Sequence, residues 1–259
     1  MSQTLRVLAL FAHPDDTEFL CAGTLCLLAD QGAVVHIATL TAGDCGSTIL
    51  PAEEISRLRL KEGERAAALL GAHFTSLKEK DLLVLYDRPT LGKVMELVRR
   101  VEPSLVFTHS PVDYMLDHEI VSRLCQTACF GAMAPNFRTG ARKPAQPLRT
   151  IPHLYYAQPA GGTDILGKEV VPSLCVNISS TLERKGRMLS CHESQGAWLK
   201  SQQGMTGPVD NMRKLAARIG ALAGFEWAEG FRQHLGQGFP SDDKLSALLG
   251  DAITRRREV

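Results

Sequence analysis

The sequence lacks a surplus of either charge. Its 29 Lys and Arg residues nearly balance its 28 Asp and Glu residues. Nucleic-acid-binding domains concentrate basic residues into a patch that follows the phosphate backbone. No such patch interrupts the body of this chain, so we expect no nucleic-acid partner.

Long apolar runs and paired cysteine motifs are also missing. No run approaches the roughly 20 apolar residues that cross a bilayer, and the N-terminus has no signal-peptide pattern. The seven cysteines are odd in number and show no CxxC spacing, which favours reduced thiols over a disulfide framework. We therefore expect a cytoplasmic protein without a membrane span.

Strand-like and helical segments alternate along the chain. Residues 5–11 form a continuous apolar run, typical of a central strand that is buried on both faces. Residues 18–30 then carry leucines at helical spacing and end at Gln31-Gly32. This alternation predicts an α/β fold, with a Rossmann-like, mostly parallel sheet covered by helices on both faces.

One main domain accounts for most of the length. We expect residues 1–240 to form it and residues 241–259 to be a peripheral C-terminal tail, which either frays or packs on a neighbouring subunit of a homo-oligomer. Residues 134–152 are rich in proline and basic residues. They are predicted to form a mobile surface loop or lid.

Two polar segments follow predicted strands. His13-Pro14-Asp15-Asp16 comes directly after the first strand, and a later strand delivers the chain to His109 and then His118. Ligands of doubly wound sheets bind beyond the carboxyl ends of the strands, so the two segments can converge. Pro14 keeps His13 extended and favours a helix start. His13 and Asp16 can therefore face one point.

The residue types in these segments suit a catalytic zinc ion. His13, Asp16 and His118 supply three ligands and leave a fourth position for water, and Asp15 can take a proton from that water as general base. Simpler alternatives remain open. An Asp pair often caps a helix, and His118 can pack against the sheet. His109 either contacts and orients a ligand or a substrate, or bonds within its loop.

These residues resemble the LmbE-like zinc-dependent N-deacetylases, which include the enzyme that de-N-acetylates N-acetylglucosaminyl-phosphatidylinositol (PIG-L). The resemblance spans most of the chain, and the segment Ala12-His13-Pro14-Asp15-Asp16 is highly specific to that family. The other matching landmarks are residues 41–46, Arg59 with Glu62, Asp87, Asp113-Tyr114, Asp117-His118 and residues 192–195.

The resemblance implies an LmbE-like fold and a site for a small N-acylated amino sugar or glycoconjugate. It implies zinc on His13, Asp16 and His118 and Asp15 as the base, with Arg59 and Asp113 as substrate contacts. The family usually carries a histidine three residues before the last ligand, to help the oxyanion. Met115 stands there in this chain, and its thioether donates no proton.

Three functions are compatible with these patterns. The first is a zinc-dependent hydrolase that removes an acyl group, with acetyl expected, from the amino group of an amino sugar or related molecule. The alternative is a metal-binding LmbE-like protein with weak or no deacetylase activity that acts in binding or assembly, as Met115 suggests. A nucleotide-binding Rossmann domain ranks last, because G-x-G-x-x-G is absent after the first strand.

Overall fold

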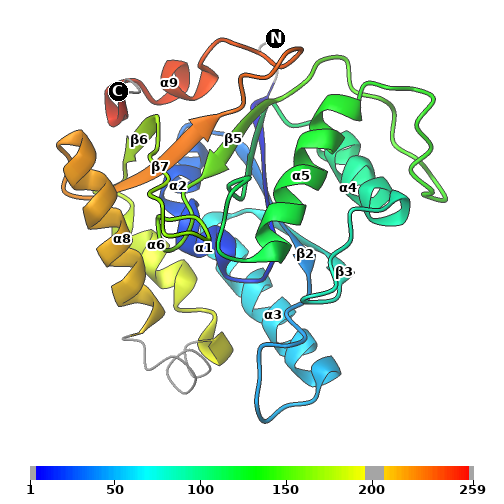
Figure 1. The fold of residues 1–259 in the computed structure, drawn as a ribbon, viewed down its shortest axis with the longest axis horizontal. Helices are drawn as coiled ribbons and strands as arrows, with labels where there is room; N and C mark the ends of the chain where they lie inside the picture. Colours follow the sequence, from blue (N-terminus) through cyan, green and yellow to red (C-terminus); the bar gives the residue numbers. More distant parts are fainter. Residues whose placement is uncertain (1–3, 196–206, 257–259) are drawn as a thin grey trace.

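A computed structural model of the chain describes residues 4–195 and 207–256 (Figure 1). Among these residues, no helix has both the length and the apolar composition that a bilayer span requires. The strands are β1 (Arg6–Phe11), β2 (Val34–Thr41), β3 (His73–Glu79), β4 (Leu105–Thr108), β5 (His153–Ala157), β6 (Leu174–Asn177), β7 (Ala228–Gln233) and β8 (Ile253–Arg255). The helices are α1 (Asp16–Leu20), α2 (Ala22–Asp30), α3 (Ala52–Leu70), α4 (Arg88–Val101), α5 (Leu116–Gly131), α6 (Leu182–Leu189), α8 (Pro208–Ala223), α9 (Lys244–Leu249) and the 3-10 turn η1 (Gly250–Ala252).

The strands form one sheet in the order β3-β2-β1-β4-β5-β7-β6-β8. The first five in this order are parallel, and β1 is paired with β2 on one side and β4 on the other. β7 is antiparallel to both β5 and β6, and β8 is antiparallel to β6. The predicted Rossmann-like, mostly parallel sheet is confirmed. The carboxyl ends of its parallel strands therefore meet along one edge.

The side chains of β1 alternate between two buried faces. Val7, Ala9 and Phe11 belong to the core that includes residues of α1, α2, α3, α6 and α8. Leu8 and Leu10 belong to the core shared with α4 and α5. Figure 1 shows α4 and α5 on one side of the sheet and α6 and α8 on the other. Burial on both faces explains why the β1 sequence is a continuous apolar run.

The C-terminal segment differs from the expected peripheral tail. It contributes α9, whose Leu245 is fully buried, and β8, which extends the sheet beside β6. The backbone N–H of Leu245 donates to the Tyr155 hydroxyl of β5 at 3.0 Å. The described part of residues 241–259 therefore shares the sheet and core of the preceding chain.

The proline-rich stretch 134–152 lies away from the carboxyl ends of the parallel strands. It joins the end of α5 to the start of β5, and so occupies the amino-terminal edge of the sheet (Figure 1). Arg99 of α4 donates to the carbonyl oxygens of Ala132, Ala134 and Phe137 at 3.0, 2.6 and 3.2 Å. The surface loop is thus anchored to α4, and it is not placed to serve as a lid over the predicted site.

A buried ion pair joins β7 to the helices next to the site. Lys185 Nζ of α6 lies 2.5 Å from Glu229 Oε1 of β7, and both side chains are 2% exposed. The same carboxylate accepts the backbone N–H groups of Gly23 and Thr24, at the start of α2, at 2.8 and 2.7 Å. Glu229 therefore fixes α2, which follows α1 and the turn after β1.

Replacing Lys185 with Met should leave the Glu229 carboxylate buried without its cation. Removing one partner of a buried pair typically costs about 3–5 kcal/mol, so the free energy of unfolding in urea should fall by that order. The control is Arg184→Met, because Arg184 pairs with the exposed Asp30 at 2.7 Å and such pairs contribute about 0–1 kcal/mol. Equal losses in the two variants would contradict a specific role for the buried pair.

Candidate metal centre

The turn after β1 has an unusual backbone conformation. Asp15, immediately before α1, has φ 118, in a region that residues with a Cβ rarely adopt. Such strain persists where surrounding contacts fix the chain. Here Arg59 Nη2, from α3, donates to the Pro14 carbonyl oxygen at 2.6 Å and to Asp15 Oδ1 at 3.2 Å. These two hydrogen bonds from Arg59 therefore fix the conformation of the turn.

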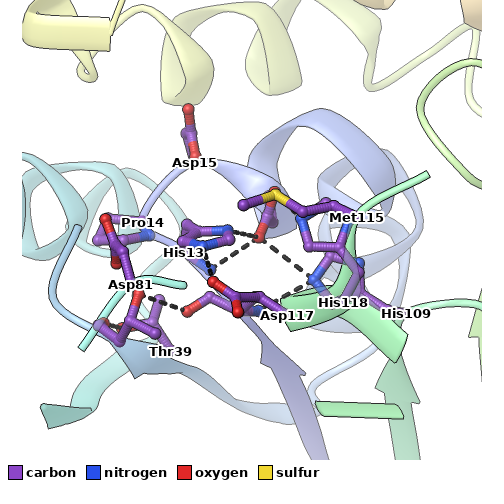
Figure 2. Close-up of polar contacts among 12 residues, drawn as sticks. His13, Pro14, Asp15, Thr39, Asp81, His109, Met115, Asp117 and His118 are labelled. Atoms are coloured by element: carbon purple, nitrogen blue, oxygen red, sulfur yellow. Dashed lines mark hydrogen bonds and ion pairs between the residues drawn. The ribbon is translucent and has the colours of Figure 1, made fainter. Parts of the chain in front are cut away.

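His13, Asp16 and His118 converge beyond the carboxyl ends of β1 and β4. Their candidate ligand atoms all lie within 4.8 Å of one another. His13 Nδ1 is 3.2 Å from Asp16 Oδ2, and His118 Nε2 is 3.7 Å from Asp16 Oδ1 (Figure 2). The structure thus brings together the three residues that the sequence predicts as ligands.

Each imidazole of this cluster is held from behind by a second carboxylate. Asp117 Oδ2 lies 3.2 Å from His13 Nε2, and Asp113 Oδ1 lies 2.9 Å from His118 Nδ1. The other nitrogen of each ring therefore faces Asp16. Metal-ligating histidines almost always have such a partner, because it sets the tautomer and the ring orientation. The donor arrangement fits a divalent cation.

Asp113 lies behind His118 and is 1% exposed. Its Oδ1 contacts the imidazole, and the backbone N–H of Asp113 donates to Glu119 Oε1 at 3.1 Å. This position supports a role in orienting His118. The contact with substrate that the resemblance implies for Asp113 stays a prediction.

The charges of the cluster are strongly coupled. Burial alone would raise the pKa of Asp16, but the neighbouring histidines, His118 above all, hold it well below the usual value. Burial alone would lower the pKa of His13, yet Asp117 and Asp16 raise it to about 10. A cation that binds here therefore meets an ionised carboxylate and competes with the proton of His13.

Asp15 is directed to a different part of the site. Figure 2 shows its side chain pointing away from the cluster of His13, Asp117 and His118. Burial raises the pKa of Asp15 to about 6, although the Arg59 guanidinium opposes the rise. The carboxyl group therefore titrates near neutral pH, as a general base should.

Arg59 also fills the space beside the loop that follows β2. A Cβ on Gly43, which has φ +73, would lie 2.5 Å from Arg59 Nη1, and one on Gly46 would lie 2.6 Å from the same atom. A side chain at either position would therefore displace the Arg59 guanidinium, and at Gly43 it would also meet an unfavourable backbone conformation. Arg59 is buried, and its guanidinium group already donates hydrogen bonds to the turn after β1. Its contact with a substrate therefore stays a prediction.

His109 and Met115 complete the surroundings of His118. The His109 ring stacks on that of His118, with centroids 3.8 Å apart, and His109 Nε2 accepts the Ala12 N–H at 2.9 Å. Burial and His118 together lower the pKa of His109 to about 4, so it is neutral. These contacts favour a supporting position, and a substrate contact of His109 stays a prediction. In Figure 2 the Met115 side chain extends from the start of α5 toward the cluster.

Sequence reasoning missed the positions of Asp117 and Asp81 beside His13. Asp117 was recognised only as a motif neighbour of His118, although a carboxylate beside a ligand histidine is a usable signal. Asp87, the landmark that the resemblance places after the third strand, is the residue before α4. It caps α4 by accepting the Thr90 N–H at 2.8 Å. Asp81 is the acidic residue that follows β3 and lies beside His13 (Figure 2).

The α/β sheet and its cluster of two histidines and a carboxylate define an LmbE-like fold. The resemblance inferred from the motifs is confirmed, because residues 8–129 match the PIG-L family, described as GlcNAc-PI de-N-acetylase. This match contains His13, Asp16 and His118.

The chain is similar to enzymes of two kinds. It is 27% identical over 235 residues to diacetylchitobiose deacetylase of Thermococcus kodakarensis, covering 88% of this chain and 82% of the relative. It is 27% identical over 196 residues to 4-oxalmesaconate hydratase of Pseudomonas putida, covering 73% of each chain. The solved N,N'-diacetylchitobiose deacetylase of Pyrococcus horikoshii matches with a TM-score of 0.74 and 25% identity, over 88% of this chain and 83% of that one.

Replacing Asp117 or Asp113 with Asn should weaken metal binding. Loss of the carboxylate behind a ligand histidine typically lowers metal affinity by about 10–100-fold, and competition with a chromophoric chelator would measure the change. The control is Asp242→Asn, because Asp242 contacts His153 Nε2 at 2.9 Å in a pair outside the cluster. If all three variants kept the affinity of the unmodified protein, the proposed orientation of His13 and His118 would be wrong.

Proposed function

We propose that this protein is a zinc-dependent hydrolase that removes an acyl group, with acetyl expected, from the amino group of an amino sugar or related small molecule. The observation that carries the proposal is the convergence of His13, Asp16 and His118, within the segment that matches a de-N-acetylase family. The diacetylchitobiose deacetylases similar to this chain support the reaction and the substrate class.

Zinc is the cation that this donor set suits. Two imidazole nitrogens and one carboxylate oxygen are typical of catalytic zinc sites that keep a position open. When bound, zinc supplies Lewis acidity, which polarises a carbonyl oxygen and lowers the pKa of water. His13, Asp16 and His118 would hold it, while Asp117 and Asp113 would keep the two rings in place.

Asp15 would act as the general base. Its carboxylate would accept a proton from the water that attacks the amide carbon, and would later return a proton to the departing amine. Hydrogen bonds of catalytic groups often tighten only when substrate is bound. The position of Asp15 against Arg59 is therefore compatible with this role.

The remaining properties follow from the same proposal. The expected ligand is an N-acylated amino sugar or glycoconjugate, and the expected location is the cytoplasm. A homo-oligomer would bury the exposed apolar side chains of Leu82 and Leu83, on the loop after β3, and of Leu116, at the start of α5.

Replacing Asp15 with Asn should abolish most turnover without removing the metal. General acid–base catalysis typically contributes about 10²–10⁴-fold, so amine release from N,N'-diacetylchitobiose by the zinc-loaded variant should fall by that order. Asp16→Asn is the comparison, because it should lose both zinc and activity. Unchanged rates in Asp15→Asn would remove this residue from the mechanism.

Replacing Met115 with His should raise the hydrolytic rate. One oxyanion donor is typically worth about 10²–10³ in rate, and the imidazole would start from the N-cap position of α5, next to the cluster. Met115→Leu is the control, since it keeps the apolar volume and adds no donor. A gain with His but not Leu is expected in kcat for the same substrate. No gain on any N-acetylated sugar would favour the metal-binding alternative without turnover.

Hydration of an unsaturated acid is a second candidate function. It is favoured by the similarity to 4-oxalmesaconate hydratase and by Met115, which leaves the oxyanion without a histidine donor. Both reactions need an activated water molecule beside a polarised carbonyl group. Offering 4-oxalmesaconate and N,N'-diacetylchitobiose to the same zinc-loaded protein separates the two candidates.

A further inference from the structure

A second group of metal-ligating side chains lies on the loops after β2 and β3. β2 and β3 are parallel neighbours, so the loops that follow them emerge at the same edge of the sheet. There the candidate ligand atoms of Asp44, Cys45 and Asp81 lie within 4.8 Å of one another. None of these residues belongs to the cluster of His13, Asp16 and His118.

Backbone hydrogen bonds hold the two loops together at this point. The N–H of Asp81 donates to Asp44 Oδ1 at 2.8 Å, and the N–H of Cys45 donates to Asp81 Oδ2 at 2.9 Å. Each loop thus binds a carboxylate of the other. The second oxygen of each carboxylate, Asp44 Oδ2 and Asp81 Oδ1, takes no part in these two bonds.

The second oxygen of Asp81 lacks a hydrogen-bond partner within the described part of the protein. Asp81 is 7% exposed, and among the described residues its buried Oδ1 atom accepts no hydrogen bond. Buried carboxylate oxygens are normally satisfied, so an unpaired one indicates a missing donor or cation. Asp44 Oδ2 lies 3.2 Å from Lys80 Nζ, in an ion pair whose lysine side chain is 62% exposed.

We propose that Asp44, Cys45 and Asp81 form a second binding site, for a divalent cation that accepts a thiolate ligand, such as Zn²⁺. Two carboxylates alone would suit Mg²⁺ or Ca²⁺, but a cysteine selects a softer cation. The Cys45 side chain is exposed, so a cation from solution can reach it. Binding requires loss of the thiol proton.

The second site is connected to the first through one peptide unit. Leu82, the residue after Asp81, donates its backbone N–H to Asp117 Oδ2 at 2.8 Å, and Asp117 contacts His13. Leu82 has φ 63, so this loop is held in a conformation that a leucine seldom adopts. A cation on Asp81 would brace the loop that positions His13.

Titration of the metal-free full-length protein with Co²⁺ tests the proposal independently of any enzymatic activity. A thiolate ligand produces a sulfur-to-cobalt charge-transfer band in the near ultraviolet, and the cluster of His13, Asp16 and His118 contains no sulfur ligand. We expect this band to grow as a second equivalent of Co²⁺ binds. Cys45→Ser should lose both the band and that equivalent. Asp81→Asn should bind it about tenfold or more weakly.

Two further variants separate this site from the first. Asp16→Asn should lose one equivalent and keep the band, so failure of the proposed hydrolase function would leave this result intact. Cys191→Ser, which removes the other cysteine that is not buried, should keep the charge-transfer band and both equivalents of Co²⁺. A band absent from the unmodified protein, or one that survives Cys45→Ser, would overturn the proposal.

Discussion

The site depends on the pairing of each cluster histidine with a carboxylate behind it. Asp117 holds His13 from the start of α5, and Asp113 holds His118 from the loop after β4. Because a ring that bonds through one nitrogen presents the other, these pairs turn both imidazoles toward Asp16. They also join the ends of β1, β3 and β4, since Asp117 accepts the N–H of Leu82. Without these pairs the sheet would still bring His13, Asp16 and His118 close together, but the two imidazole rings would not be oriented toward Asp16.

The fold and the three central residues were predictable because they rest on local patterns. Apolar runs identify the parallel strands, and the tetrad at His13 and the segment at His118 each follow a strand end. β7 was missed because a buried strand containing Glu229 does not look apolar, and its carboxylate is tolerated only through Lys185 and the start of α2. Asp81 was missed because its importance arises from contact with a distant loop, which no periodicity encodes.

The chain is similar both to deacetylases and to a hydratase, and the geometry of this site suggests how one arrangement of residues could serve either reaction. A cation with Asp15 nearby can activate water for addition to an amide or to a conjugated double bond, and the two reactions differ in where the proton must go next. Met115 occupies the N-cap of α5, the position where the resemblance implies a proton donor. In the proposed function, His13, Asp16 and His118 would hold the cation, and the residues around them would decide which reaction follows.

The left-handed conformation of Asp15 has a consequence for how the turn can change through evolution. Glycine adopts a φ of 118 without the steric cost that a Cβ imposes. Selection for stability alone would therefore favour glycine at this position. Glycine would also remove the only carboxylate that faces Arg59 from this turn. An aspartate in so unfavourable a backbone position costs stability, and the proposed role of Asp15 as general base would offset that cost with activity. In related chains, a glycine at this position would remove the proposed general base even where His13, Asp16 and His118 are all present.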